Sequence, residues 1–356
     1  MDKETFAIRV PVQVANRVIQ TLRRLQLLDD RFEFERTNRT LALPIIREPS
    51  KNELSWISSE TAHIKVERVV LGEVKKRPRD LREVMSTKLP EALTSKLPRS
   101  FDVIGDIAIL DLQDELEPIA HLVGKAILGL NPHLRLVVRK SSDISGTYRT
   151  RRFIKIAGLG GTETIYREYS NLLRLDIASV YFSPRLAHER MRVANQVNDG
   201  ERVLDMFTGV GPYSILIAKT QPNSIIYSID INPEAFRYLR ENILLNHVAD
   251  RVVPILGDAR AIVSRSLQKV ASRVIMNLPS ESIKYVDTAL NALQDDGGVV
   301  HFYAFTSRNE TIDHVVDSVR SEVERHGKKI RSLRHVSVLK EVAPNRIQIA
   351  MDLDVQ

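Results

Sequence analysis

Acidic and amide side chains recur directly after short apolar runs in the second half of the chain. Asp205 follows Val203-Leu204, and Asp230 follows a run of mostly apolar residues from 224 to 229. Asp258 and Asn277 come just after two further runs, at 252–256 and 273–276. In an open α/β sheet such runs are parallel strands, and ligands bind at their carboxyl ends. An acid at the end of the second strand suits hydrogen bonds to ribose hydroxyls, so the pattern predicts a site for a nucleoside-containing ligand.

The turn after the first of these strands contains two glycines, in the stretch Asp205-Met206-Phe207-Thr208-Gly209-Val210-Gly211-Pro212. Glycine lets a backbone approach a ligand closely, and Pro212 is tolerated in the first turn of the helix expected next. The spacing is not the G-x-G-x-x-G that seats a pyrophosphate. The alternative is that these glycines only form a tight turn between a strand and a helix.

A helix is expected after each of the first two strands. After Asp230, Asn232 is suited to cap a helix and Pro233 to occupy its first position. The four strand ends taken in order resemble the class I S-adenosylmethionine-dependent methyltransferases. This resemblance implies an α/β, Rossmann-like domain that binds S-adenosylmethionine.

Composition limits the classes of function. The 356 residues are enough for two or three domains, and the net charge of +7 favours a polyanionic partner. The chain contains no cysteine, which excludes disulfides, thiolate metal sites and a cysteine nucleophile. No long apolar run is present, so we expect a cytoplasmic protein without a membrane segment. We also expect no metal centre.

Upstream of the class I pattern, the sequence predicts two smaller α+β domains. Residues 1–63 read as a strand, a helix, a hairpin and a polar linker, and residues 64–178 as a middle domain of strands and helices. The stretch 63–70 could be a strand of either neighbour. The cationic run 75–79 is more typical of a solvated face than of a binding site. Residues 179–356 then form the class I domain.

Several blocks make the resemblance more specific. The chain is similar to the archaeal-type tRNA (guanine-N1)-methyltransferases that act at position 37, on four stretches: Gly146-Thr147-Tyr148-Arg149-Thr150-Arg151, Tyr181-Phe182-Ser183-Pro184-Arg185 with Glu189, 205–212, and Asn277-Leu278-Pro279. The similarity covers essentially the whole chain and implies a tRNA substrate, with the N-terminal module recognising the tRNA body. One departure is Ser280-Glu281-Ser282, where class I enzymes that methylate amino groups commonly have an aromatic residue.

The resemblance also implies roles for individual residues. Glu189 is the expected general base that removes the N1 proton, and Arg149 the expected cation that stabilises charge on O6. Arg151 and Arg152 lie close enough to Arg149 to be alternatives to it. The expected contacts of the cofactor are Asp205, Phe207 and Gly209 near its methionine part, Asp230 and Ile231 at ribose and adenine, Asp258 and Ala259 at adenine, Asn277 beside the reacting groups, and Arg190 from the bridging helix. For Ile231 and Ala259, core packing is the alternative.

Three other functions stay open at this point. The first is a class I methyltransferase for another RNA nucleotide, or for a tricyclic wyosine precursor at the same tRNA position. The second is a nicotinamide-dependent oxidoreductase, which the missing G-x-G-x-x-G disfavours. The third is a non-catalytic RNA-binding protein with a decayed fold. We expect a monomer, because nothing in the sequence calls for a dimer.

Overall fold

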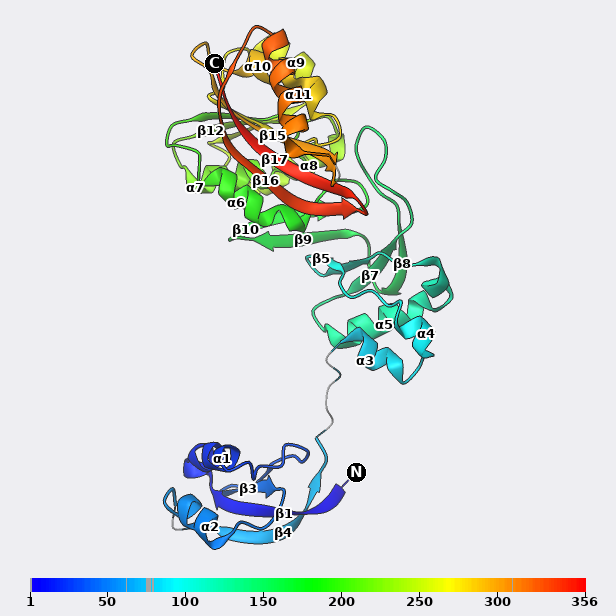
Figure 1. Ribbon diagram of the computed structural model, residues 1–356, viewed down its shortest axis with the longest axis vertical. Coiled ribbons are helices and arrows are strands. Elements are labelled where there is room, and N and C mark those ends of the chain that lie inside the picture. The colour runs from blue at the N-terminus through cyan, green and yellow to red at the C-terminus, as the bar shows by residue number, and fades with distance from the viewer. Residues whose placement is uncertain (1, 62, 75–77, 79, 309) are drawn as a thin grey trace. The chain divides into compact units, whose positions relative to one another are not determined.

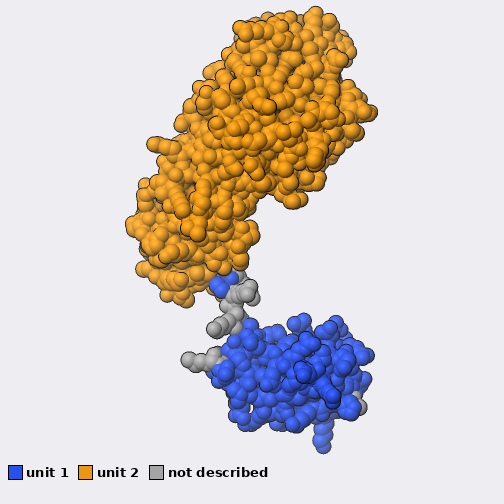
Figure 2. All heavy atoms as spheres, turned by 180° about the vertical axis from the view of Figure 1, so that it is seen from behind, with its two compact units in different colours: residues 1–78 blue, residues 79–356 orange. Residues whose placement is uncertain are grey.

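The chain forms two compact units, residues 1–78 and residues 79–356 (Figure 2). The computed structural model describes residues 2–61, 63–74, 78, 80–308 and 310–356. The cationic run predicted at 75–79 lies, except for Pro78, outside the described residues.

The described residues of the first unit form a four-stranded antiparallel sheet with two α-helices and one short 3₁₀ helix. The strands are β1 (Asp2–Pro11), β2 (Glu35–Arg36), β3 (Thr40–Ile45) and β4 (Lys65–Gly72), in the order β2-β3-β1-β4, and the helices are η1 (Val12–Val14), α1 (Ala15–Arg24) and α2 (Lys51–Ser58). Val18 and Leu22 of α1 and Ile57 of α2 pack with strand residues in one apolar core. This unit therefore has a hydrophobic core of its own.

Two expectations for this unit need correction. The predicted linker contains α2, which begins with a capping box in which Ser50 Oγ accepts from the Glu53 amide and the Glu53 carboxylate accepts from the Ser50 amide. The strand left open at 63–70 is β4, which pairs with β1 from Asp2↔Gly72 to Arg9↔Lys65. Because β4 completes the first sheet, the first unit continues to residue 78 and does not end at 63.

The second unit begins with a smaller mixed layer. Its strands β5 (Asp102–Ile104), β6 (Ile107–Leu110), β7 (Leu136–Lys140) and β8 (Phe153–Gly158) form one sheet in that order, with β6 and β7 parallel. The helices α3 (Leu81–Ser86), α4 (Glu91–Thr94), η2 (Asp114–Ile119) and α5 (Ala120–Leu130) accompany this sheet, and the hairpin β9 (Glu163–Glu168) and β10 (Asn171–Asp176) follows it. Residues of α3 and α5 share an apolar core with β6 and β7.

The largest layer is a seven-stranded sheet in the order β13-β12-β11-β14-β15-β17-β16 (Figure 1). Its strands are β11 (Arg202–Asp205), β12 (Ile225–Asp230), β13 (Val252–Leu256), β14 (Arg273–Met276), β15 (Gly298–Ser307), β16 (Ile330–Ala343) and β17 (Arg346–Val355). The first five positions in the order are parallel, and β17 runs antiparallel to both of its neighbours. The predicted α/β, Rossmann-like architecture is confirmed.

Helices cover both faces of this sheet. One face packs against α9 (Ala259–Ser266), α10 (Val286–Ala292) and α11 (Ile312–Arg325), and the other against α6 (Ala187–Ala194), α7 (Pro212–Thr220) and α8 (Pro233–Leu245). Two 3₁₀ turns, η3 (Pro184–Leu186) and η4 (Ser282–Tyr285), precede α6 and α10. The two buried layers hold the carboxyl ends of the parallel strands in fixed positions at one edge of the sheet.

The middle layer and the large sheet are not independent. Ile107 and Leu136 of the smaller sheet share a core with Val210 and Tyr238 beside the larger one. Asn242 of α8 donates to the backbone of Arg174 in β10 at 3.0 Å and accepts from it at 2.7 Å. Residues 79–356 are therefore one compact unit, and the boundary expected after residue 178 does not separate two of them.

Candidate active site

A cleft of about 1020 Å³ opens at the carboxyl ends of the parallel strands. A volume at the upper end of the range for ligand sites leaves room for a nucleoside cofactor and part of a second ligand. Its wall combines the ends of β11 to β14 with the 143–151 loop, the 181–185 segment and the end of β16. Most of the predicted site residues line it, namely Arg149, Phe207, Gly209, Asp230, Ile231, Asp258, Ala259 and Asn277.

The glycine-rich turn and Asp230 form the centre of this wall. Gly209 and Gly211 have φ of +57° and +90°, values that side chains with a Cβ rarely adopt. At Gly211 an added Cβ would also meet Leu239 Cδ1 at 2.5 Å. The Asp230 carboxylate accepts from the backbone amides of Gly209 at 2.6 Å and Asn232 at 2.9 Å. These bonds fix the carboxylate and leave it further lone pairs for the two hydroxyls of a ribose.

Asp205 lies behind this wall and is fully buried. Ser214 Oγ donates to Asp205 Oδ2 at 2.9 Å, whereas Asp205 Oδ1 has no hydrogen-bond partner within the described residues. Burial raises the pKa of Asp205 to about 6. A carboxylate buried directly behind the first loop would attract the ammonium group of a ligand in the cleft through its charge.

The next part of the cleft offers apolar and capping groups. Ile231 is 40% exposed although it is aliphatic, so the core-packing alternative does not apply to it, whereas Ala259 is buried in the core beside the sheet. Asp258 accepts from the Ala261 amide at 3.2 Å and thereby caps α9. Phe207 meets the Tyr285 ring edge to face, with 5.0 Å between the ring centroids. An exposed aliphatic face beside fixed carboxylates fits the adenosine part of S-adenosylmethionine.

Arg149 reaches the opposite wall of the cleft from the 143–151 loop. Its backbone has φ of +54°, its guanidinium donates to Ser280 Oγ, and the guanidinium carbon lies 5.6 Å from the centroid of the Tyr181 ring. Burial lowers its pKa. Among the described residues no carboxylate forms an ion pair with it. A partly desolvated cation without a counterion can stabilise negative charge that develops on a substrate.

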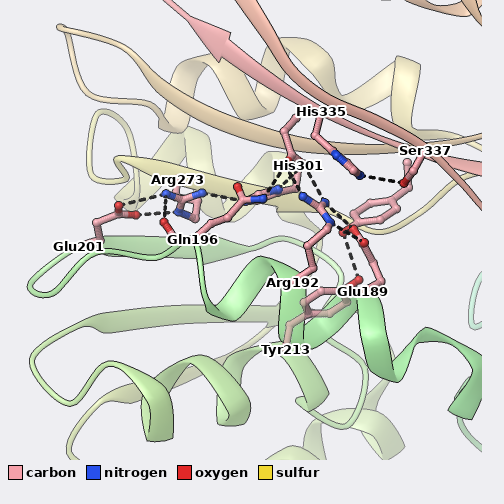
Figure 3. Close-up of polar contacts among 11 residues, drawn as sticks. Glu189, Arg192, Gln196, Glu201, Tyr213, Arg273, His301, His335 and Ser337 are labelled. Atoms are coloured by element: carbon pink, nitrogen blue, oxygen red, sulfur yellow. Dashed lines mark hydrogen bonds and ion pairs between the residues drawn. The ribbon is translucent and has the colours of Figure 1, made fainter.

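Glu189 is buried and does not line the cleft. Arg192 donates to both of its oxygens at 2.7 Å, and Tyr303 Oη donates to Oε1 at 2.7 Å (Figure 3). Phe305, two residues along β15 from Tyr303, is part of the cleft wall. The carboxylate is thus held behind the lining by a buried network.

Arg190 is also withdrawn from the cleft. Its guanidinium donates to both carboxylate oxygens of Glu168, at 2.7 and 2.5 Å, and to the backbone carbonyl of Ser183 at 3.2 Å. These bonds connect the 181–185 segment to β9, and Arg190, for which a cofactor contact is expected from the sequence, does not line the cleft.

Lys340 is a cleft residue that sequence reasoning missed. It lies near the end of β16, and its Nζ donates to Ser183 Oγ at 3.1 Å. Burial lowers its pKa to about 8. Nothing in its local sequence marks it, because only the position of β16 in the sheet brings it to the cleft.

No group of three or more His, Cys, Asp or Glu side chains suited to a metal ion occurs in the part of the chain that the structure describes. Within the same residues, no helix has the length and apolarity needed to cross a bilayer.

Family models match three successive parts of the chain. They are the tRNA methyltransferase 5 N-terminal domain at residues 7–53, the TYW2 N-terminal domain at 81–161 and the TRM5/TYW2 methyltransferase domain at 164–332. The last model begins at β9, which agrees with the packing of the β9–β10 hairpin against the large sheet and not with a boundary after 178.

Individual proteins agree with these models. Trm5b of Pyrococcus abyssi, named tRNA (guanine(37)-N(1))-methyltransferase, is 39% identical over 99% of both chains, and its crystal structure superposes with a TM-score of 0.77. The solved complex of aTrm5 and tRNALeu is 30% identical, has a TM-score of 0.77 and covers 98% of this chain and 99% of that one. TYW2 of P. horikoshii, solved with MeSAdo, is 27% identical, has a TM-score of 0.66 and covers 77% of this chain and 97% of that one.

The TYW2 structure thus corresponds to only part of this chain, whereas the two Trm5 structures correspond to nearly all of it. The first unit carries the match to the Trm5 N-terminal domain. The chain belongs to the Trm5 family of tRNA (guanine(37)-N(1))-methyltransferases.

Proposed function

We propose that this protein transfers the methyl group of S-adenosylmethionine to N1 of guanine at position 37 of tRNA. The observation that carries the proposal is the end-to-end correspondence with Trm5b, in which the first unit is included. By contrast, the TYW2 structure of P. horikoshii covers only 77% of this chain. The cleft at the strand ends supplies a place for the cofactor next to Arg149, which forms no ion pair with a carboxylate among the described residues.

S-adenosylmethionine, when bound, supplies a methyl group whose leaving group is a neutral thioether. The difficulty is therefore on the acceptor, because guanine N1 carries a proton. As that proton leaves, negative charge grows on O6. Arg149 would stabilise this charge, since its guanidinium is partly desolvated, donates to Ser280 and lies over the Tyr181 ring.

Glu189 is the proposed general base. A carboxylate that takes the N1 proton must come within hydrogen-bond reach of it. Glu189 has to turn from Arg192 and Tyr303 toward the cleft when the base is bound, and apo structures often hold catalytic groups away from their final positions.

The remaining site residues are proposed to hold the cofactor. Asp230 would accept from the ribose hydroxyls, Ile231 and Asp258 would flank adenine together with the backbone of Ala259, and Phe207 and Gly209 would border the methionine part. Asn277 would lie beside the reacting groups. Asp205 and Arg190 would support the site from behind its lining, Asp205 through its charge and Arg190 through Ser183.

The partner is tRNA, for which the first unit would be the recognition module, and we propose that the enzyme acts as a monomer in the cytoplasm. The net charge of +7 suits a polyanionic substrate.

The test uses an unmodified tRNA transcript with guanosine at position 37, a matched transcript with adenosine there, and mass mapping of the methyl group. We expect 1-methylguanosine at position 37 of the first transcript only, and a Glu189→Gln rate roughly 10²–10⁴-fold lower in single-turnover assays. A methyl group at another nucleotide would refute the assigned reaction, and failure to bind S-adenosylmethionine in calorimetry would favour a non-catalytic RNA-binding protein.

A further inference from the structure

A chain of buried and partly buried polar side chains extends from Glu189 through Arg192 and His301 to Arg273 (Figure 3). Arg192 lies at its centre and is shared by two carboxylates. On one side it donates to both oxygens of Glu189, and on the other to both oxygens of Asp352 in β17, one of these at 3.0 Å. The side chain of Asp352 is fully buried, and that of Glu189 is 4% exposed.

Asp352 has partners besides Arg192. His301 Nδ1 lies 2.7 Å from Asp352 Oδ1, and Gln196 Nε2 donates to Oδ2 at 2.9 Å. His301 Nε2 faces Arg273 Nη1 at 2.9 Å. Because an arginine can only donate, Nε2 accepts and the proton of a neutral imidazole is on Nδ1, where it donates to Asp352. Burial lowers the pKa of His301, which agrees with a neutral ring.

The charges in this cluster follow directly. Glu189 and Asp352 are two carboxylates, Arg192 is one cation, and His301 is neutral, so the cluster of Glu189, Arg192 and Asp352 carries one net negative charge. Burial opposes the ionised form of Asp352, but the hydrogen bonds from His301 and Arg192 outweigh it and lower the pKa. The second carboxylate therefore stays ionised whatever happens to Glu189.

We propose that Asp352 is a positioning residue for the general base: it retains Arg192 when Glu189 turns to the substrate and takes up the N1 proton. This inference rests on the proposed role of Glu189. In the step, the N1–H proton moves to a Glu189 oxygen, the N1 lone pair forms the new N–C bond, and the C–S bonding pair stays on sulfur.

Without Asp352, this step would leave Arg192, whose side chain is only 23% exposed, without its carboxylate partners, which is costly for a partly desolvated cation. With Asp352 present, Arg192 keeps a carboxylate partner and the cluster changes from one net negative charge to none. Asp352 does not touch the substrate in this account. It acts only through Arg192, and its effect must therefore depend on Glu189.

Charged and titratable groups face Glu189 from several elements, and each of them can influence how the rate depends on pH. They are Arg192 and the Arg190–Glu168 pair from α6 and β9, Tyr213 from α7, Tyr303 and His301 from β15, and Asp352 from β17. Burial raises the pKa of both tyrosines, so neither ionises in the range in which the enzyme is assayed.

The experiment is a double-mutant cycle on the full chain, with single-turnover rates measured from pH 6 to 9 on the guanosine-37 transcript. Asp352→Asn keeps the shape of the side chain and removes its charge. We expect a tenfold or larger loss of rate and a half-maximal rate at lower pH, because the surroundings of Glu189 become more positive. In the Glu189→Gln background the same change should alter the rate less than twofold.

Glu201→Gln is the matched control. Glu201 is a carboxylate on a buried arginine, Arg273, in the same network, but it does not contact Arg192. We expect it to leave the pH at half-maximal rate unchanged. Should Asp352→Asn lose its fold, as judged by cofactor binding and thermal melting, Arg192→Lys takes its place, since an ammonium cannot bond both oxygens of two carboxylates.

An equal loss of rate in both backgrounds, or a wild-type rate for Asp352→Asn, would overturn the role of Asp352. If Glu189→Gln itself kept the wild-type rate, the base would lie elsewhere and the inference would fall with it. If Glu189→Gln is slow but Asp352→Asn lowers the rate equally in both backgrounds, Glu189 remains the proposed base and only the role of Asp352 is refuted.

Discussion

Replacing Asp205 by asparagine should stabilise the protein at neutral pH and weaken its hold on the cofactor. The carboxylate is fully buried, one of its oxygens accepts no hydrogen bond from the described part of the chain, and burial makes its charge unfavourable. Asparagine keeps the oxygen that accepts from Ser214 and removes the charge. It also removes the negative charge behind the glycine-rich turn that would attract the ammonium group of the cofactor.

The size of the effect follows from the pKa of Asp205, which rises from 3.8 to about 6 on folding. The folded protein binds the proton more tightly than the unfolded chain, so the contribution of this group is fully favourable below pH 3.8 and is lost as the pH rises through about 6. Ionisation of Asp205 then lowers the free energy of unfolding by about 3 kcal/mol at pH 7 and by about half of that at pH 5.

Urea unfolding of both proteins at pH 5, 6, 7 and 8 measures this difference, and calorimetry at pH 7 measures the affinity for S-adenosylmethionine. We expect the asparagine variant to be more stable at every pH above 5, with an advantage that grows up to about pH 7. Asp250→Asn is the control, because Arg251 lowers the pKa of the exposed Asp250 and its replacement should not stabilise the protein. A less stable Asp205→Asn protein, or an advantage independent of pH, would refute the reasoning.

Four further outcomes are expected. Asp230→Ala removes the carboxylate held by two backbone amides, and calorimetry should show S-adenosylmethionine binding weakened by roughly 1.5–3 kcal/mol; an unchanged affinity in a folded variant would take Asp230 out of the site. Deleting residues 1–78 should leave that affinity intact, since the second unit has its own cores, and should weaken tRNA association; equal single-turnover rates at subsaturating tRNA would contradict a recognition role. Arg149→Lys should slow single-turnover methylation roughly 10–100-fold, because an ammonium lacks the planar fork, and a rate within twofold of wild type would mean that another group stabilises O6. Lys340→Met should raise the urea midpoint at pH 7, because burial lowers the pKa of the lysine from 10.5 to about 8 and makes its charge costly; that gain should shrink between pH 8 and 10, and tRNA binding should weaken with the loss of a cation.

The parts of the site that local sequence determines could be predicted. Asp230 follows an apolar run and precedes Asn232 and Pro233, and in the structure Asn232 caps α8 by accepting from the Glu234 amide at 3.0 Å. Each of these features depends on neighbours within a few residues. Local sequence therefore predicts where the strands end and which residues at these ends line the cleft.

The capping box at Ser50 was also visible, as a serine with a glutamate three residues later, and reading this stretch as a linker overlooked it. The boundary at residue 63 failed for another reason. Whether β4 belongs to the first or the second unit depends on its pairing with β1, some sixty residues away, and alternation within 64–70 carries no information about its partner.

Contacts between segments that are far apart in the sequence explain the other differences between the expected and the observed site. That Glu189 would accept from Tyr303, and that Lys340 would reach the cleft, depends on strands that are distant in the sequence. Charge and spacing around Glu189 cannot reveal a partner on β15. Such contacts are set by sheet order, which only the folded chain defines.

The position of β17 has a consequence for how the protein is made. This strand lies between β15 and β16 although it follows both in the chain, and it pairs with β15 from Gly298↔Val355 to Ser307↔Arg346. A nascent chain that ends at residue 345 lacks β17, so β15 and β16 have no strand between them. Arg192 also lacks its partner Asp352 at that stage. The first unit and the β11–β14 core can form while synthesis continues, because domains fold as their residues emerge. We therefore expect chains that lack β17 to have no methyltransferase activity, because the sheet is then incomplete and Arg192 has no Asp352.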